Sequence, residues 1–307
     1  MPVPPAKWSP SSTVTTNLKA LLPAGAPSFD LHFDDAPTIY VNGQPNRTDT
    51  AVRKLERDMG SATALDPYNG GQQTPIAQRL ADTVEEQTLH MINADPKRTP
   101  TFTMFGNADF FFQGSSSGTC GGTTPTCVDS KFAWNHGDFQ DEIANTWVGF
   151  VGPGVRSNGI DSTTWTDHVD YRPTINALLG LHDSYLDDGR VITQILGHGG
   201  NEDEQGDSST ADQLGAVYKA VNAPFGQFAL DTLVASTAAL KSTDELKYDS
   251  IETAIANLTT ERNALAGAIR YALNSGGSVG DDQAEAWIKQ GQSLLDRAHA
   301  LAAANPA

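Results

Sequence analysis

The chain has 307 residues, of which 38% are hydrophobic and 19% are charged. This composition is that of a globular protein with one large domain or two smaller ones, and it excludes collagen, coiled-coil rods and mostly disordered chains. The net charge is −17, so the surface repels phosphate backbones and we expect no nucleic-acid partner. The sequence has no run of about eighteen apolar residues, so we expect no membrane span.

The first 130 residues mix short β-prone runs with helical patterns and polar loops. Thr38–Val41 predicts a strand, and the pair Asn42-Gly43 predicts a turn after it. A second strand is expected at Thr101–Phe105. Phe110–Phe112 is interpreted either as the start of another strand or as a buried plug.

A helix is expected between Thr74 and Asn93. Four apolar residues recur there near helical spacing, namely Ile76, Leu80, Val84 and Leu89. The pair Asp95-Pro96 marks the predicted end, because proline cannot continue a helix.

The two cysteines, Cys120 and Cys127, lie seven positions apart in a loop of Gly, Ser and Thr. Such a loop is flexible enough to bring both thiols together, whereas a metal site would need more Cys or His nearby. We therefore expect a disulfide, which is typical of periplasmic or secreted proteins. The first seven residues lack the apolar core of a secretory signal, so the start of the chain is interpreted as truncated.

The middle of the chain predicts a strand, a turn and a helix in succession. Trp147–Val151 is typical of a buried strand, and the four residues 152–155 form a Gly-Pro-Gly turn after it. Pro173 is well placed as the first residue of a short helix, Thr174–Leu179, which Gly180 ends.

From Ala211 onward the sequence is alanine-rich and helical, with no β signal. The spacing of its apolar residues predicts an all-helical bundle of two to three main helices. A polar hinge at 198–210 separates this region, 211–307, from an α/β region at 1–197.

Three stretches of the middle segment resemble the C-terminal part of the alkaline phosphatase superfamily: Phe132–Asp138, Thr146–Val155 and Asp167–Gly180. In that superfamily a His-Gly turn precedes a strand that ends in Gly-Pro-Gly. A segment of the type Val-Asp-x-x-Pro-Thr-x-x-x-Leu-x-Gly then opens the next helix, and Val169–Gly180 matches it. The most similar branch is type I phosphodiesterase/nucleotide pyrophosphatase, with sulfatases as more distant relatives.

The resemblance implies the C-terminal part of an alkaline-phosphatase-like α/β/α sandwich, followed here by the helical bundle. It also implies a pair of divalent metal ions, usually zinc, and a Thr or Ser nucleophile that together hydrolyse small phosphate-ester substrates. Within this pattern, His136 matches the late histidine that completes one metal site. Asp138 follows it, and we expect its carboxylate to orient the His136 ring or a bound water without contacting the metal itself.

Further candidate ligands lie elsewhere. Asp30, His32 and Asp34 alternate along a predicted extended segment, which would put them on one face. In the superfamily, a similarly placed segment belongs to a non-catalytic cap, so a structural role is the other interpretation. His168 is flanked by two aspartates, which suits a metal ligand, while its place in the motif favours a structural turn.

The nucleophile and most of the superfamily's metal ligands are not found in this sequence. One hypothesis is therefore that the chain is the C-terminal half of a hydrolase whose other ligands lie in a missing N-terminal half. The alternatives are a degenerate, non-catalytic member that binds a partner through its helical bundle, and a sulfatase-like hydrolase of sulfuric esters.

Overall fold

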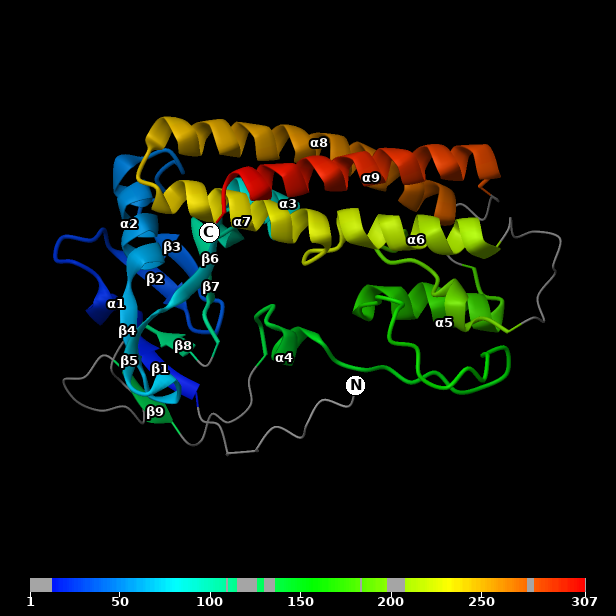
Figure 1. Cartoon of the computed structure of the whole chain (residues 1–307), viewed down its shortest axis with the longest axis horizontal. Helices are drawn as coiled ribbons and strands as arrows, with labels where there is room; N and C mark the ends of the chain where they lie inside the picture. The colour runs from blue at the N-terminus through cyan, green and yellow to red at the C-terminus, as the bar shows by residue number, and fades with distance from the viewer. Residues whose placement is uncertain are drawn as a thin grey trace. The chain divides into compact units, whose positions relative to one another are not determined.

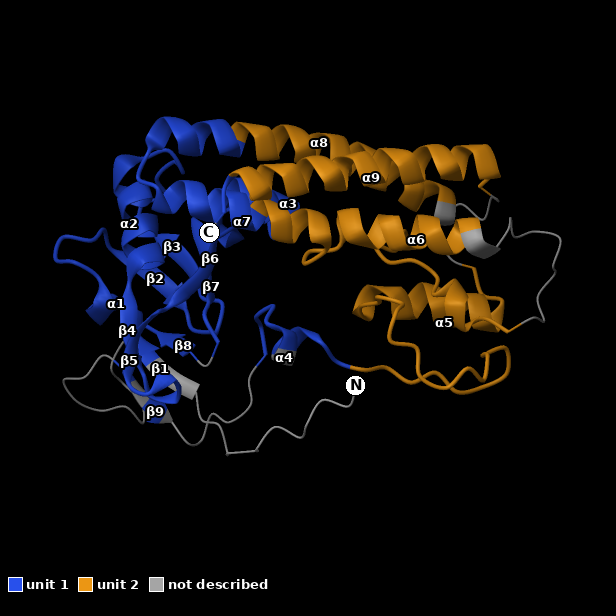
Figure 2. Cartoon of the chain, viewed as in Figure 1, with its two compact units in different colours: residues 1–146, 233–252, 305–307 blue, residues 147–232, 253–304 orange. Residues whose placement is uncertain are grey.

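The computed structural model describes residues 13–108, 110–114, 126–129, 136–182, 184–197, 208–274 and 279–306. The protein is mixed α/β, with a helical C-terminal region (Figure 1). Two compact units make up the chain (Figure 2). Unit 1 contains residues 1–146, 233–252 and 305–307, and unit 2 contains residues 147–232 and 253–304. In the described part of the chain, no helix has the length and apolar character that crossing a membrane requires.

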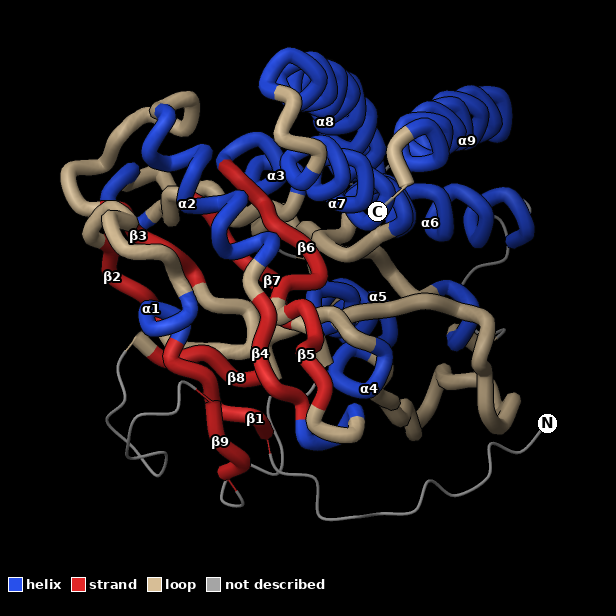
Figure 3. The backbone as a smooth tube through the Cα atoms, turned by 60° about the vertical axis from the view of Figure 1, so that its left-hand side comes forward, coloured by secondary structure: helices blue, strands red, loops and turns tan. Residues whose placement is uncertain are grey.

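The strands of unit 1 form three small sheets (Figure 3). The four-stranded sheet is antiparallel and has the order β2 (Phe29–His32), β3 (Thr38–Val41), β7 (Phe102–Gly106), β6 (Ala77–Asp82). The three-stranded sheet has the order β8 (Phe110–Gln113), β1 (Thr13–Asn17), β9 (Thr126–Asp129), with β1 and β8 parallel. A separate hairpin pairs β4 (Thr63–Asp66) with β5 (Gln72–Pro75).

Helices complete unit 1: α1 (Leu18–Leu21), α2 (Thr50–Ser61), α3 (Thr83–Thr88), α4 (Asp141–Ala144), two 3-10 turns at Pro67–Asn69 and Pro96–Arg98, and parts of α7 (Gln227–Lys241) and α8 (Glu245–Asn274). The side chain of Asp49 begins α2 by accepting the Ala51 N–H at 2.8 Å. Its apolar face joins a core in which the following residues have no exposed surface: Ile39, Val52, Leu55, Met59, Ile76 and Met104. Burying each such side chain contributes roughly 1.5–3 kcal/mol.

The short β-prone runs are confirmed as strands. Thr38–Val41 is β3, Thr101–Phe105 is β7 shifted by one residue, and Phe110–Phe112 begins β8. The turn at Asn42-Gly43 is also confirmed, since Gly43 has a φ of +88° that favours glycine.

The predicted helix between Thr74 and Asn93 is wrong. Residues 77–82 form β6, and only Thr83–Thr88 is helical. The reason is tertiary: β7 pairs with one edge of β6, and on β6 the Leu80 N–H donates to the Thr237 hydroxyl of α7 at 3.0 Å. A capping box formed by Asp82 and Glu85 then begins the helix at Thr83.

Unit 2 contains the larger part of the helical C-terminal region. It includes α6 (Ser208–Asn222), α9 (Asp281–Ala304) and parts of α7 and α8. These helices share a core of Leu214, Tyr218, Phe228, Leu265, Ile269 and Leu294. The described residues from 208 to 304 thus form four helices, where the sequence predicted two to three. Helices α6 and α9 approach closely because Gly291 has no side chain, since a Cβ there would lie 2.2 Å from Val217 Cγ1.

Unit 2 also contains α5 (Tyr171–Leu179) and 3-10 turns at His168–Asp170 and Thr193–Ile195. Gly180 ends α5 with a φ of +63°, as the sequence predicts, but the helix begins at Tyr171, before Pro173. The predicted buried strand at Trp147–Val151 is wrong in this structure, because the stretch forms no strand and is largely exposed.

Two other expectations fall partly outside the described residues. Cys120 lies outside them, and Cys127 lies on β9, so the disulfide stays a prediction. Residues 198–207 of the predicted hinge also lie outside them, and α6 begins at Ser208.

Candidate functional site

Asp34 lies against the turn that contains His136, although the sequence places them far apart. A Cβ on Gly137 would lie 2.7 Å from Asp34 Oδ1 and 3.0 Å from Oδ2. Gly137 also has a φ of +102°, so both the backbone and this close approach require glycine. The main chain of Asp34 is held to β8, where the Phe112 N–H donates to the Asp34 carbonyl at 3.0 Å. Asp34 and His136, two of the predicted metal-ligand candidates, therefore lie at the same turn of unit 1.

Asp138 lies buried at the same turn. Its Oδ1 accepts the Phe139 N–H at 2.7 Å, and its Oδ2 accepts the Gln140 side-chain amide at 3.0 Å. Burial, with a smaller contribution from the charge of Asp35, outweighs the lowering effect of these hydrogen bonds and raises the pKa of Asp138 to about 7. Asp138 therefore titrates near neutral pH, where a carboxyl group can both accept and release a proton. The imidazole of His136, by contrast, is exposed.

Asp30 and His32 alternate on β2 as expected, and both are exposed. The ring of His32 stacks on Phe33, with centroids 5.5 Å apart. Strand β2 ends at His32, before Asp34, whose carboxylate lies at Gly137. Within the described residues, Asp30, His32 and Asp34 do not form a group whose ligand atoms all lie within 4.8 Å of one another.

His168 lies in unit 2, in the 3-10 turn before α5. It borders a pocket of about 450 Å³ that is also lined by Arg172, Tyr185 and Asp187. The two flanking aspartates have structural partners: Lys219 Nζ lies 2.7 Å from Asp167 Oδ2 and 3.1 Å from Asp170 Oδ2. These ion pairs favour the structural interpretation of the His168 turn.

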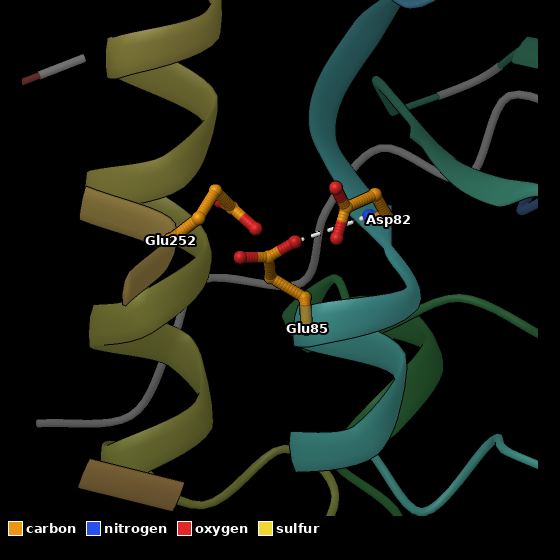
Figure 4. A group of neighbouring side chains, drawn as sticks. All are labelled: Asp82, Glu85 and Glu252. Carbon is orange, nitrogen blue, oxygen red and sulfur yellow. Dashed lines mark hydrogen bonds between the residues drawn. The ribbon is translucent and has the colours of Figure 1, made fainter. Parts of the chain in front are cut away.

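Sequence reasoning missed a buried acidic cluster in unit 1, which consists of Asp82, Glu85 and Glu252 (Figure 4). Asp82 ends β6, Glu85 lies in the first turn of α3, and Glu252 projects from α8. All three are at most 2% exposed, and each offers an oxygen within 4.8 Å of the others. They form the one such group among the residues that the structure describes.

Two arginines neutralise the Asp82 end of the acidic cluster. Arg53 Nη2 lies 2.6 Å from Asp82 Oδ2, and Arg47 Nη1 lies 3.0 Å from the same oxygen. The Tyr248 hydroxyl also donates to it, at 3.3 Å. Burial alone would raise the pKa of Asp82, but the charges of Arg53 and Arg47 and these hydrogen bonds bring it below its ordinary value. Asp82 is therefore ionised.

Glu85 and Glu252 face each other at the end of the acidic cluster away from the arginines (Figure 4). Burial and the charge of Asp82 together raise the pKa of Glu252 to about 8, against the lowering effect of Arg47 and Arg53. Burial, then the charges of Glu252 and Asp82, raise the pKa of Glu85 well above its ordinary value. Both oxygens of Glu252 and Oε1 of Glu85 lack a hydrogen-bond donor among the described residues, and the nearest cation to Glu252 Oε2 is Arg47 Nη1 at 3.5 Å. A proton shared by the two carboxyl groups removes their repulsion and gives each a partner. Three carboxylates could also hold a divalent cation, but the arginines already occupy Asp82 Oδ2, so the shared proton fits better.

No protein-family model, curated protein or solved structure matches this chain. The resemblance to the alkaline phosphatase superfamily therefore depends on the motif residues between 132 and 180 alone.

Proposed function

We propose that this chain is part of a metal-dependent hydrolase of phosphoric esters, of the alkaline phosphatase superfamily, and that His136 and Asp34 are metal ligands. One observation carries the proposal: the carboxylate of Asp34 lies against Gly137, next to His136. The motif resemblance selects His136, and the spacing of acidic residues selects Asp34, so their meeting at one turn supports both. In this proposal, residues 1–197 correspond to the C-terminal part of an α/β/α sandwich, and the helical region 211–307 follows it.

The donor types fit zinc. An imidazole nitrogen and a carboxylate oxygen are preferred zinc ligands in catalytic sites, which commonly have three protein ligands. His136 is exposed and Asp34 is half-buried, so both are open to an incoming ion. Because two donors do not complete a two-metal centre, the remaining ligands and the nucleophile have to come from polypeptide outside the described residues. When bound, the metals would stabilise the attacking and leaving oxygens of the ester.

The described residues around the proposed site hold the candidate ligands in position. The Asp35 N–H donates to Asp34 Oδ1 at 2.8 Å and so fixes the orientation of the Asp34 carboxylate. Asp138 accepts hydrogen bonds from the Phe139 N–H and the Gln140 side-chain amide, so its carboxyl group is fixed at the turn of His136. The net charge of −17 does not oppose an anionic substrate if metal ions hold its phosphate group. Phosphodiesters fit the branch that the motif resembles, and sulfuric esters are the related alternative.

Zinc affinity of the purified chain tests the proposal. We would measure it by competition with a chromophoric chelator for the wild type, His136→Ala and Asp34→Asn, with His168→Ala and Asp30→Asn as controls. Both site variants should bind zinc about tenfold more weakly or worse, and the controls should match the wild type. Equal zinc affinity of His136→Ala and the wild type would reject the assignment. Aryl phosphodiester and aryl sulfate hydrolysis by the protein with its complete ligand set would then identify the ester class.

A further inference from the structure

The acidic cluster of unit 1 carries more negative charge than its neighbouring arginines neutralise. Arg53 and Arg47 form ion pairs with the carboxyl groups around them. The four carboxyl groups of this network are each at most 2% exposed, namely Glu56, Asp82, Glu85 and Glu252. When all six groups are ionised, four negative and two positive charges leave a net charge of −2. A buried net charge is costly, so the network needs either protons or a further cation.

Three oxygens of the network lie close together without a hydrogen-bond donor among the described residues: both oxygens of Glu252 and Oε1 of Glu85. The Glu252 side chain has no exposed surface, so bulk water does not reach it. The two carboxyl groups point toward each other (Figure 4). A proton shared between them occupies one oxygen of each and leaves the second oxygen of Glu252 without a donor. A divalent cation between the two groups would contact all three oxygens.

The donor set and its spacing suit a hard cation. The acidic cluster offers only carboxylate oxygens and contains no imidazole or thiol. Mg²⁺, Mn²⁺ and Ca²⁺ prefer such ligands, whereas zinc and copper sites commonly use nitrogen or sulfur. Two ligands on opposite sides of an ion lie about 4.2 Å apart for Mg²⁺ and about 4.6–5.2 Å apart for Ca²⁺. The ligand oxygens of the cluster lie within 4.8 Å of one another, so the cluster is compact enough for an ion of this class.

We propose that Glu85 and Glu252 bind a divalent cation of this class, in place of the proton that they share in the ion-free protein. Asp82 contributes its charge and not a ligand, because both arginines bind its Oδ2 and its Oδ1 accepts the Val84 N–H at 2.7 Å. The Asp82 N–H donates to Glu85 Oε2 at 3.1 Å and leaves Oε1 for the ion. The bound ion joins α3 to α8 and cancels the net charge of −2, so its role is structural.

Arg47 connects this buried site with the surface. Its side chain is 28% exposed, and it belongs to the loop before α2. Its Nη1 lies 3.0 Å from Asp82 Oδ2 and 3.5 Å from Glu252 Oε2, so this guanidinium and an incoming cation repel each other and compete for the same carboxylate. Arg47→Gln should therefore strengthen cation binding by about tenfold.

This inference uses neither Asp34 nor His136, so it stands independently of the proposed function. Mn²⁺ is the probe. The loss of the electron paramagnetic resonance signal of free Mn²⁺ measures its binding to the full chain at about pH 8, where few protons compete. The parent chain and all variants carry His136→Ala, which removes a ligand of the other proposed metal site. We expect one Mn²⁺ to bind per chain, and absence of binding below about 1 mM overturns the proposal.

Matched variants assign the bound ion to the acidic cluster. Glu252→Gln and Glu85→Gln should each weaken Mn²⁺ binding about tenfold or more, because each removes a charge and an ion ligand. Glutamine keeps the shape of the side chain, and circular dichroism would check that both variants fold. Glu261→Gln, which alters a half-exposed carboxylate of α8, should bind as the parent chain does. Equal affinity of Glu252→Gln and Glu261→Gln would show nonspecific attraction to an acidic chain and overturn the proposal, as would unchanged or weaker binding by Arg47→Gln.

Discussion

Arg53 and Asp82 form a hydrogen-bonded ion pair of 2.6 Å in which neither side chain is more than 4% exposed. Arg53 also donates to Glu56 at 2.5 Å and lies over the ring of Tyr248, so one guanidinium connects α2, β6 and the first turns of α8. Desolvating a guanidinium is offset only when its partners are complete. Arg53 is therefore the residue around which the polar interior of unit 1 is organised.

Arg53→Ala should lower the free energy of unfolding by about 3–5 kcal/mol, because it leaves Asp82 and Glu56 buried without their main counter-charge. Urea denaturation followed by circular dichroism would measure this. Arg297→Ala is the matched control. Its partner Glu261 is about half exposed, so the loss should stay within about 1 kcal/mol. Equal losses in the two variants would contradict the role given to the buried pair.

Stability should fall as pH rises from about 5 to 8. The pKa values of Glu86 and Glu252 are raised by burial from 4.5 to about 8, so the folded state binds more protons than the unfolded state throughout this interval. The slope of stability against pH is then negative, and each of the two groups should account for a loss of about 3–4 kcal/mol over this interval. Thermal or urea unfolding at several pH values would measure it.

Glu252→Gln should flatten this dependence, since a glutamine cannot ionise and its amide can donate to Glu85. The variant should be about as stable as the wild type at pH 5 and more stable at pH 8. Glu261→Gln changes an exposed carboxylate and should follow the wild-type curve. A Glu252→Gln curve parallel to the wild type would show that Glu252 does not carry the shared proton.

Gly137→Ala should destabilise unit 1 by about 1–3 kcal/mol, because the φ of +102° is strained for alanine and the new Cβ would displace Asp34. Gly267→Ala is the control, since a Cβ there meets nothing within 4 Å and Gly267 lies inside α8, where alanine is the better helix former. The control should be neutral or stabilising. If Gly137→Ala is also neutral, the close approach of Asp34 to the His136 turn is incorrect.

The parts of the fold that sequence could predict are those that depend on neighbours in the chain. The strand at Thr38–Val41, its glycine turn and the end of α5 at Gly180 follow from local residue preferences. The helix proposed for 74–93 failed because Ile76 and Leu80 fit a helical period and a strand equally well, and the decision was made by β7 and Thr237. The Asp82–Glu85 capping box was the signal that could have placed the start of α3 correctly.

The residues of the candidate site also divide into those that local sequence could indicate and those that only the fold brings together. His136 was identified because a motif surrounds it, and Asp34 because acidic residues cluster near it in sequence. The acidic cluster was missed because Glu252 lies on a regular helix far along the chain, where an acidic residue ordinarily faces solvent. Only the folded chain places it opposite Glu85.

The uncovered stretch Trp147–Val151 has a consequence for handling the isolated protein. At low ionic strength, the charge of −17 keeps molecules apart and opposes attraction between the exposed apolar side chains of this stretch. Added salt shortens the range of that repulsion to about 8–10 Å near physiological concentration and leaves apolar attraction intact. The protein should therefore become less soluble as salt rises, and Val151→Lys, which removes a fully exposed apolar side chain, should raise the salt concentration at which it precipitates.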